Sequence, residues 1–521
     1  MPPMPPMPRA ARLVALLALA LATGAVLPGP LAAQTEFAVP LAPGQVRLDI
    51  TPWWQSWDHR YDPSSPGTPT PINAYFESDS FGVASLPFLA PLQSEIRKAS
   101  GQSGFTLDLG RTTAAMTASV RTIPIGLELG LTKSLAIGVT VPIVRSQVYV
   151  GFKTDSTRPG NVYWNDTTAT AAFRGQLAAV LAALQTQATS GPAALRAQAQ
   201  ALLDTLQPYV GVSRALFLPQ AGSAAGAGIA GRLDSMETAY AQLAAQYGDS
   251  GVSLPALTAA LPLPDSVAVL GRQDLESFFS DPAGPMAADT FGNLIRTGIG
   301  DITAHATWQF ADAKAYRGQL LFTVRFPTGS APAANEFMDL GTGTHQLGFE
   351  AALANDLVLG NRFLIHGVAR VGGASSDQIP MRVTPPWLPF APVAQQAVIR
   401  RTPAPWAGLE VSPTWLLDDA FSARVSFGYF AEGAMKHAYA DPADSARVGM
   451  PASVLDENTA VRWTRLGAGV TFSTVARYAA GKASLPYDLT VSYANTIWGS
   501  AWVPKISQFS VALRAYISVF R

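Results

Sequence analysis

The sequence predicts an all-β membrane barrel of about 12 antiparallel strands in up-and-down order, with a helical insertion in one long outer loop. Three observations lead to this prediction. Apolar residues alternate with small or polar ones along most of the chain, short connections alternate with long ones, and the N-terminus carries the pattern of an export signal.

The amino-acid composition excludes several classes of protein before any motif is considered. The chain has 521 residues, and its 36 Lys and Arg balance its 36 Asp and Glu. Charged residues make up 14% of the chain, against about 25% in soluble domains. This balance gives no electrostatic reason to expect a nucleic-acid partner, and 48% hydrophobic residues excludes wholesale disorder. The absence of cysteine excludes disulfides and thiolate chemistry.

The N-terminus reads as a secretory signal peptide. Arg9 and Arg12 precede an apolar run over 13–27, and Ala33 ends a candidate cleavage site, so residues 1–33 are assigned to the signal. The run of about 15 residues is shorter than the ~20 of a spanning helix. No later segment holds 18 uninterrupted apolar residues. We therefore expect Sec-type export and insertion into the outer membrane of a Gram-negative cell.

A hairpin at 123–143 shows the strand pattern most clearly. Leu127 and Leu129 alternate with Gly126 and Glu128, and a turn at 131–134 leads into a second alternating segment. The same alternation recurs at 302–310, 320–326, 347–353, 363–371, 407–411, 421–429, 466–472, 487–493 and 511–519, and a first strand lies around 46–50. These segments total twelve. A soluble sandwich would also alternate, but its polar face would be richer in Lys and Glu.

Connection lengths favour the barrel over the sandwich. Short connections fall at 131–134, 311–315, 355–361 and 417–420, with a longer one at 475–484. Long connections fall at 59–111, 155–297, 328–343, 375–402 and 434–459. Barrels have short periplasmic turns, longer outer loops and both termini in the periplasm. The short outer connection at 499–505 departs from this pattern.

The period changes to about 3.6 between 168 and 281, which predicts packed helices. We therefore divide the mature chain into N-terminal barrel strands at 34–154, a helical insertion at 155–297 and C-terminal barrel strands at 298–521. By strand parity the insertion is extracellular, as a cap, gate or plug. The Gly/Ala stretch at 221–231 is read as a flexible linker between helices.

Several short motifs resemble, in order and spacing, the outer-membrane transporter family named for the meta-pathway of phenol degradation. They are IPIGLELGLT at 123–132 followed by GVTVP at 138–142, GIGDI at 298–302, FPTG at 326–329 and LGTG at 340–343. The resemblance covers the chain from about residue 116 onward, without the helical insertion. It implies a barrel that passes hydrophobic or aromatic small molecules. Asp301 is expected to pair with an inward-facing arginine rather than to bind a ligand.

The alternation places a set of ionisable residues on the inward face, and these are the candidate residues for a solute path. They are Glu128, Arg145, Asp301, His305, Arg325, Glu350, Arg362, His366, Arg370, Glu410, Arg424, Arg465, Asp488 and Arg514. With Asp49, which has the same inward phase, six acidic residues nearly balance seven arginines, and a strongly ion-selective pore needs a ring of one sign. We therefore expect an outer-membrane channel for weakly charged or hydrophobic solutes, working by passive or gated diffusion.

Two alternatives stay open: an outer-membrane hydrolase, and a structural or adhesive protein that binds a partner through its helices. No metal-ligand spacing appears among the five histidines, and no nucleophile-elbow or phosphate-loop motif is present. We expect no enzymatic activity, no catalytic residues, no metal and no cofactor. The expected partners are outer-membrane lipid, a small-molecule solute and the machinery that inserts barrels.

Overall fold

The computed structural model describes residues 41–265, 269–289, 292–360, 362–388 and 390–519, so the signal peptide expected at 1–33 lies outside the described residues. The described chain forms two compact units. The barrel unit contains 41–74, Ala115–Gly151 and 279–519, and the helical unit contains Tyr75–Ala114 and Phe152–Phe278. The second unit therefore combines most of the insertion expected at 155–297 with part of the first long connection, whereas the described residues from 279 to 297 belong to the barrel unit.

Twelve antiparallel strands close into a ring in the barrel unit. Two of them are interrupted: β1 (Gln45–Ile50) continues into β2 (Trp53–Trp57) past Pro52, and β9 (Leu294–Ile299) continues into β10 (Thr303–Ala313). The others are β5 (Gly110–Gly130), β6 (Leu135–Pro159), β11 (Tyr316–Arg325), β12 (Gly348–Leu359), β13 (Phe363–Ala374), β16 (Trp406–Leu416), β17 (Phe421–Glu432), β19 (Arg462–Ser473), β20 (Tyr487–Ser500) and β21 (Ser507–Ser518). The ring closes because β1 and β2 pair with both β5 and β21. The predicted barrel of about twelve strands is confirmed.

The two faces of the ring have opposite character. Outward side chains such as Phe322 and Phe349 are each 54% exposed, whereas inward Arg370 is 2% exposed and Arg514 is 4% exposed. A water-soluble protein would bury the aromatic rings and expose the arginines. The arrangement suits a barrel whose outer face contacts lipid and whose interior is polar.

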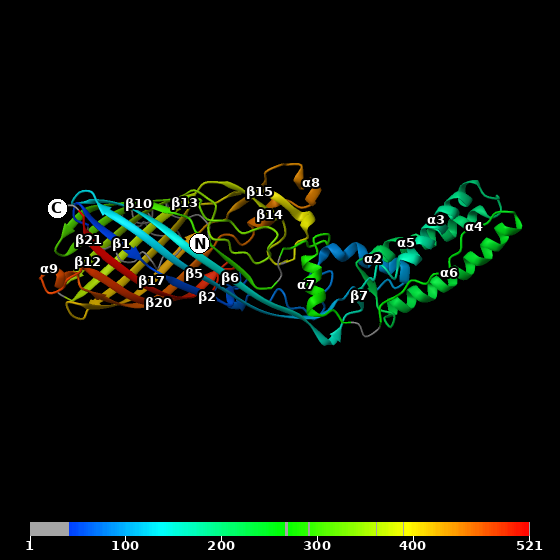
Figure 1. Cartoon of the computed structure of the whole chain (residues 1–521), viewed down its shortest axis with the longest axis horizontal. Helices are drawn as coiled ribbons and strands as arrows, with labels where there is room; N and C mark the ends of the chain where they lie inside the picture. The colour runs from blue at the N-terminus through cyan, green and yellow to red at the C-terminus, as the bar shows by residue number, and fades with distance from the viewer. Residues whose placement is uncertain (1–40, 266–268, 290–291, 361, 389, 520–521) are drawn as a thin grey trace, which may run out of the picture. The chain divides into compact units, whose positions relative to one another are not determined.

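The connections at the two ends of the barrel differ in length. Helix α9 (Val475–Ala479) lies at one end, and β14 (Asp377–Arg382), β15 (Gln396–Thr402) and α8 (Asp444–Val448) lie at the other (Figure 1). The first end has the short turns, such as 131–134 and 417–420. At the second end, β14, β15 and β18 (Lys436–Tyr439) form a small outer sheet over a core that includes Val383 and Ile399.

A β-bulge separates β9 from β10. Ile299 pairs with Ile143 of β6, but Thr303 pairs with Thr140, so the β9–β10 strand holds one extra residue there. As a result Gly300 and Asp301 both line the interior, although they are neighbours in sequence. A bulge of this kind redirects a side chain, and here it turns Asp301 into the lumen.

The helical unit contains α2 (Ala90–Ser100), α3 (Ala171–Ser190), α4 (Arg196–Leu206), α5 (Pro208–Arg214), α6 (Ala224–Asp249) and most of α7 (Arg272–Ser280). Two short strand pairs lie outside the ring: β7 (Val162–Trp164) pairs with β8 (Phe217–Pro219) in this unit, and β3 (His59–Tyr61) pairs with β4 (Pro69–Pro71) in the barrel unit. Short 3-10 helices lie at Pro87–Leu89, Val393–Gln395 and Ala452–Asp456. The packed helices predicted there are present, and the apolar side chains Phe173 and Leu177 of α3 are buried. Among the described residues, no helix has both the length and the apolar character needed to span a membrane.

The Gly/Ala stretch at 221–231 is mostly helix, and the expected flexible linker is wrong. Helix α6 starts at Ala224, where the Ser223 side chain accepts a hydrogen bond from the Gly226 amide at 3.0 Å and caps the helix. Glycine serves packing here, because a Cβ at Gly228 would lie 2.6 Å from the Ser100 carbonyl oxygen at the end of α2. The close approach of the two helices outweighs the low helix propensity of glycine.

Candidate functional site

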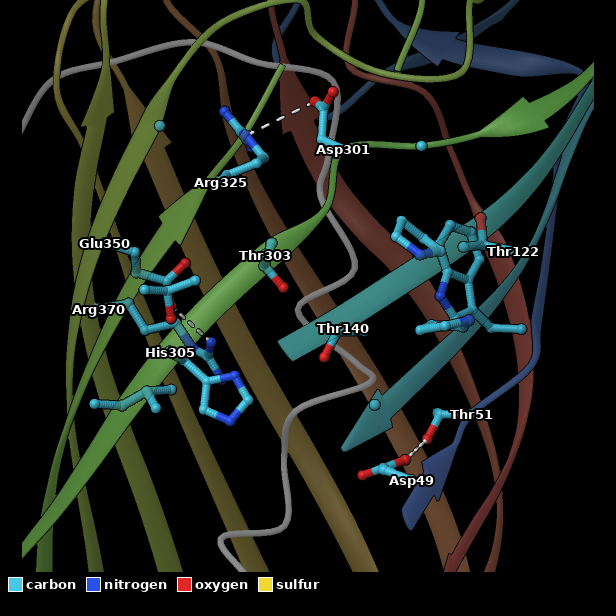
Figure 2. A pocket seen from close by; sticks show the side chains of 18 of the residues that line it. Asp49, Thr51, Thr122, Thr140, Asp301, Thr303, His305, Arg325, Glu350 and Arg370 are labelled. Carbon is cyan, nitrogen blue, oxygen red and sulfur yellow. Dashed lines mark hydrogen bonds and ion pairs between the residues drawn. The ribbon is translucent and has the colours of Figure 1, made fainter. Parts of the chain in front are cut away.

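A cavity of about 450 Å³ occupies the barrel interior. Its lining includes Leu41, Ser134 and Gln309 near the end with the short turns, and Trp406 and Trp463 near the opposite end. The residues that line it thus come from both ends of the barrel. Figure 2 shows polar side chains from several strands pointing into this space, among them Thr122, Thr140 and Thr303.

The charged residues in the cavity wall are paired with opposite charges. Arg514 Nε lies 2.9 Å from Asp49 Oδ2, and Arg370 Nη1 lies 3.0 Å from Glu350 Oε1 (Figure 2 shows the second pair). Arg47 forms an ion pair with Glu128. Pairing offsets part of the desolvation cost of each charge, and it leaves the wall with little net charge.

Most of the candidate residues from the sequence lie inside the barrel. Those that line the main cavity are Glu128, Asp301, His305, Arg325, Glu350, Arg370 and Arg514. Glu410, Arg424 and Arg465 line a second, smaller cavity of about 40 Å³. His366 and Asp488 line neither cavity, and each is bonded within the wall: His366 Nδ1 lies 2.6 Å from Asp356 Oδ1, and the Tyr516 hydroxyl donates to Asp488 Oδ2 at 2.8 Å.

Two candidates are not in the lumen. Arg145 is exposed and shares the outward register of Ile143, whereas its neighbours Val144 and Ser146 are buried. The expected inward phase was wrong for this residue because 145 has the same parity as the apolar positions 137–143. Arg362 has the inward parity, but it lies in the turn before β13 and is exposed.

The residues around Asp301 hold a segment of chain inside the barrel. This segment, the lumen loop, is residues 326–347 between β11 and β12. Asp301 Oδ1 accepts a hydrogen bond from the Gly329 amide at 3.0 Å, and Oδ2 accepts from the Thr344 amide and hydroxyl, both at 2.8 Å. The nearest arginine, Arg325, is 3.9 Å away at Nε. Asp301 therefore acts mainly on the backbone of the lumen loop. Its expected arginine pairing, drawn as the dashed line to Arg325 in Figure 2, is the weaker contact.

Three of the sequence motifs meet in this cluster. The Thr328 hydroxyl donates to the Gly300 carbonyl at 2.7 Å, and the Thr342 hydroxyl donates to the Ile299 carbonyl at 3.1 Å. A Cβ at Gly329 would lie 2.7 Å from Gly343 Cα, so the two chain segments pack backbone to backbone. The motifs GIGDI, FPTG and LGTG thus supply the two ends and the anchor of the lumen loop.

The outer sheet contacts the same loop. Arg401 of β15 donates from Nη2 to the Thr344 carbonyl at 2.9 Å and from Nε to Asp377 at 3.0 Å. Gln346 also donates to Asp377 at 3.0 Å. Thr344 is therefore bonded to the barrel wall through its amide and to the outer sheet through its carbonyl.

Aromatic rings line the cavity near the end where the outer sheet lies. Phe430 stacks on Trp463 with ring centroids 5.3 Å apart, and Trp406 lies 5.6 Å from Phe430. Trp53 and Trp57 line the same cavity from β2. Sequence reasoning missed these aromatic residues because it considered only ionisable groups, and it missed Arg47 because it assigned that residue to neither face of the first strand. The alternation of Arg47 with Val46 and Leu48 was the available signal.

The cavity presents no metal centre: no group of three or more His, Cys, Asp or Glu side chains that could hold a metal ion occurs within the described part of the chain. Its walls offer hydrogen bonds, paired charges and aromatic faces.

Comparison with known proteins gives distant structural neighbours. No protein-family model and no curated protein sequence matches the chain. An outer membrane channel from Pseudomonas putida aligns over 95% of this chain and 100% of its own, with 10% identity and a TM-score of 0.42. A Pseudomonas aeruginosa FadL homologue aligns over 96% and 99%, with 8% identity and a TM-score of 0.28. The Pseudomonas putida toluene transporter TodX aligns over 91% and 90%, with 9% identity and a TM-score of 0.27. All three TM-scores are below 0.5, so the assignment of this chain to a twelve-stranded barrel depends on its own strand pairing and not on these neighbours.

Proposed function

We propose that the protein is a channel of the Gram-negative outer membrane, reached by Sec-type export, through which weakly charged or hydrophobic small molecules, including aromatic ones, diffuse. The observation that carries the proposal is the cavity of about 450 Å³ whose lining residues come from both ends of the barrel. Cavities of about 300–1,000 Å³ suit ligands of small-molecule size.

The paired charges in the wall favour weakly charged solutes. A net charge of one sign would attract counter-ions and repel co-ions, and the pairs Arg514 with Asp49 and Arg370 with Glu350 remove such a field. The aromatic rings of Phe430, Trp463 and Trp406 offer apolar faces to a solute at the outer end. Aromatic rings bind flat apolar groups through offset or edge contacts.

The meeting of GIGDI, FPTG and LGTG around Asp301 supports a relationship to the meta-pathway transporter family. Hydrogen bonds among the three motifs hold the lumen loop against the barrel wall in this chain. Motifs with a common structural task are expected to be retained together, so their joint presence supports the relationship more than each motif alone.

The proposal is tested by liposome swelling. The purified full chain is reconstituted and exposed to an uncharged pentose, to gluconate and to lysine, beside a Thr303→Trp variant. Thr303 lines the cavity, so the larger side chain should slow swelling. We expect the pentose to enter faster than either ion. If the wild-type barrel, shown to be folded by heat-modifiability on a gel, passes none of the three solutes, the proposed passage of weakly charged polar solutes is wrong.

One arrangement bears on the hydrolase alternative. Ser412, His366 and Asp356 lie directly opposite one another on β16, β13 and β12. However, the Ser412 hydroxyl donates to Glu410 Oε1 at 3.3 Å, Ser412 is 1% exposed and His366 is 5% exposed. Neither lines either of the cavities described above. A buried triad without access cannot bind an ester, so we expect a fluorophosphonate probe to leave Ser412 unlabelled.

A further inference from the structure

Two exposed arginines lie side by side on the outer face of the barrel wall. Arg121 is on β5 and Arg145 is on β6, and both follow the outward register. Neither is used by the lumen described above.

The register of β5 and β6 places the two arginines opposite each other. The Leu131 amide donates to the Leu135 carbonyl at 2.8 Å across the turn, and a Cβ at Gly126 would lie 3.1 Å from Thr140 Oγ1. In each pair the two residues are equally far from the turn. Continuing the same register puts Arg121 opposite Arg145, ten residues from the Leu131–Leu135 pair.

The arginines mark the edge of an apolar band. On the outward register between the turn and Arg121, β5 presents Ile123, Ile125, Leu127 and Leu129, and β6 presents Leu135, Ile137, Val139, Val141 and Ile143 before Arg145. Ten residues span about 33 Å along a strand, or about 25 Å along the membrane normal at a tilt of about 40°. The apolar band of outer-membrane barrels is about 25 Å tall, so Arg121 and Arg145 lie at the outer headgroup level.

Aromatic neighbours fit this level. β2 pairs with the edge of β5 that faces away from β6, and in this pairing Trp54 lies opposite Arg121. The Trp54 ring lies 5.6 Å from the ring of Phe509 on β21. Both rings are exposed. Aromatic side chains are enriched where the apolar band of a barrel meets the headgroups.

The two guanidinium groups lack a counter-charge within the described residues, where neither Arg121 nor Arg145 forms an ion pair or a side-chain hydrogen bond. Like charges directly opposite on neighbouring strands destabilise a sheet. An anion between them would remove the repulsion, and arginine binds phosphate through two parallel hydrogen bonds.

We propose that Arg121 and Arg145 form a binding site for the phosphate of a lipid A-type glycolipid in the outer leaflet of the membrane. We infer a lipid of the outer leaflet because the two arginines lie at the outer edge of the apolar band. We infer a phosphate because two positively charged guanidinium groups lie opposite each other on neighbouring strands. The site is independent of solute passage through the lumen.

The test measures lipid binding to the purified full-length barrel by native mass spectrometry, with bisphosphoryl lipid A as the probe. The variant R121Q/R145Q removes both charges, and K133Q/K314Q removes two exposed charges from the turns at the opposite end. We expect R121Q/R145Q to bind lipid A at least tenfold more weakly and K133Q/K314Q to bind it as the wild type does. R121K/R145K, which keeps the charge but loses the planar donors, should lie between them.

Two further probes, phosphatidylglycerol and inorganic phosphate, show whether the site prefers the phosphate of lipid A over other phosphates. Phosphatidylglycerol should bind more weakly than lipid A, and inorganic phosphate should compete only at much higher concentration. Equal binding of lipid A by R121Q/R145Q and wild type, with both barrels folded by heat-modifiability, would overturn the proposal. So would equal binding of phosphatidylglycerol and lipid A. Liposome swelling by R121Q/R145Q should match the wild type, so loss of lipid binding and failure of the channel proposal can be told apart.

Discussion

At the scale of single residues, Asp301 shows how a buried carboxylate can organise backbone. It is 9% exposed, and its two oxygens accept bonds from two ends of the lumen loop, at Gly329 and Thr344. A carboxylate can accept several N–H bonds at once. The bulge that turns Asp301 inward therefore decides where the loop lies.

Substitution Asp301→Ala should release the lumen loop. Two backbone amides lose their acceptor, so we expect the free energy of unfolding to fall by about 2–4 kcal/mol and single-channel conductance in planar bilayers to rise. Asp488→Ala is the matched control, because Asp488 is also inward but accepts its bond from Tyr516, away from the loop. Equal conductance of Asp301→Ala and wild type would contradict a constricting role for the loop.

The outer sheet contains a pH-sensitive pair. Burial lowers the pKa of His437, and this effect exceeds the opposing influence of Asp456, whose Oδ1 lies 3.0 Å from His437 Nδ1. Burial alone would raise the pKa of Asp456, but hydrogen bonds from His437 and Lys436 lower it overall. Arg401 and Asp377 also act on His437. For both groups the unfolded state binds protons at a higher pH than the folded state does.

Stability of the outer sheet should therefore fall on acidification, through His437 below about pH 6.5 and through Asp456 only below about pH 4. We expect faster hydrogen exchange at 436–439 and 452–459 at pH 5.5 than at pH 7.5, after correction for intrinsic rates. His437→Gln should reduce the difference, and His59→Gln should not. A difference that persists unchanged in His437→Gln would assign the effect to another group.

At the scale of elements, the sequence predicts the strands better than their irregularities. Alternation locates the hairpin of β5 and β6 because the outward side chains between 123 and 143 are apolar and the inward ones are small or polar. It cannot show the bulge at 300–302, which depends on pairing with β6, or the inward course of the lumen loop, which depends on contacts with β9 and β15. The error at Arg145 has a different origin: charge was taken as a sign of the lumen, whereas the apolar band simply ends there.

The same limit applies to helix α6, where composition predicted a linker. Its glycines differ in their surroundings: a Cβ at Gly228 meets the Ser100 carbonyl at 2.6 Å, whereas one at Gly231 meets nothing within 4 Å. A local pattern cannot register a contact with α2, which is more than a hundred residues earlier in the chain.

These two glycines give a matched pair of variants. Gly231→Ala should stabilise α6 by up to about 1 kcal/mol through helix propensity. Gly228→Ala gains the same propensity but forces α2 and α6 apart, so we expect net destabilisation by about 1–3 kcal/mol. Hydrogen exchange of α6 in the full chain measures both. Similar protection in the two variants would show that α2 and α6 do not pack closely.

At the scale of the whole molecule, the barrel combines an apolar exterior with an interior of compensated charges. Asp49 faces Arg514, Glu350 faces Arg370 and Glu128 faces Arg47. Each pair joins different strands, and the pairs Asp49 with Arg514 and Arg47 with Glu128 also connect segments far apart in sequence. Sequence alone could give the near balance of acidic and basic residues, but not which residue pairs with which, because partners depend on the shear of the closed ring.

This compensation predicts weak ion selectivity, and breaking one pair should set its sign. In a planar bilayer under a KCl gradient, we expect the wild-type reversal potential to lie near zero. Glu128→Gln leaves Arg47 without its partner and should shift the reversal potential toward that of chloride, whereas Arg47→Gln leaves Glu128 and should shift it toward that of potassium. The double variant restores neutrality at this level of the wall and should return the potential to near zero.

His305, with Nε2 at 4.0 Å from Glu128, is unchanged in all four proteins, so it does not account for opposite shifts. Shifts of the same sign in the two single variants would mean that the permeant ions do not pass this pair, and the conducting path would then lie elsewhere in the barrel.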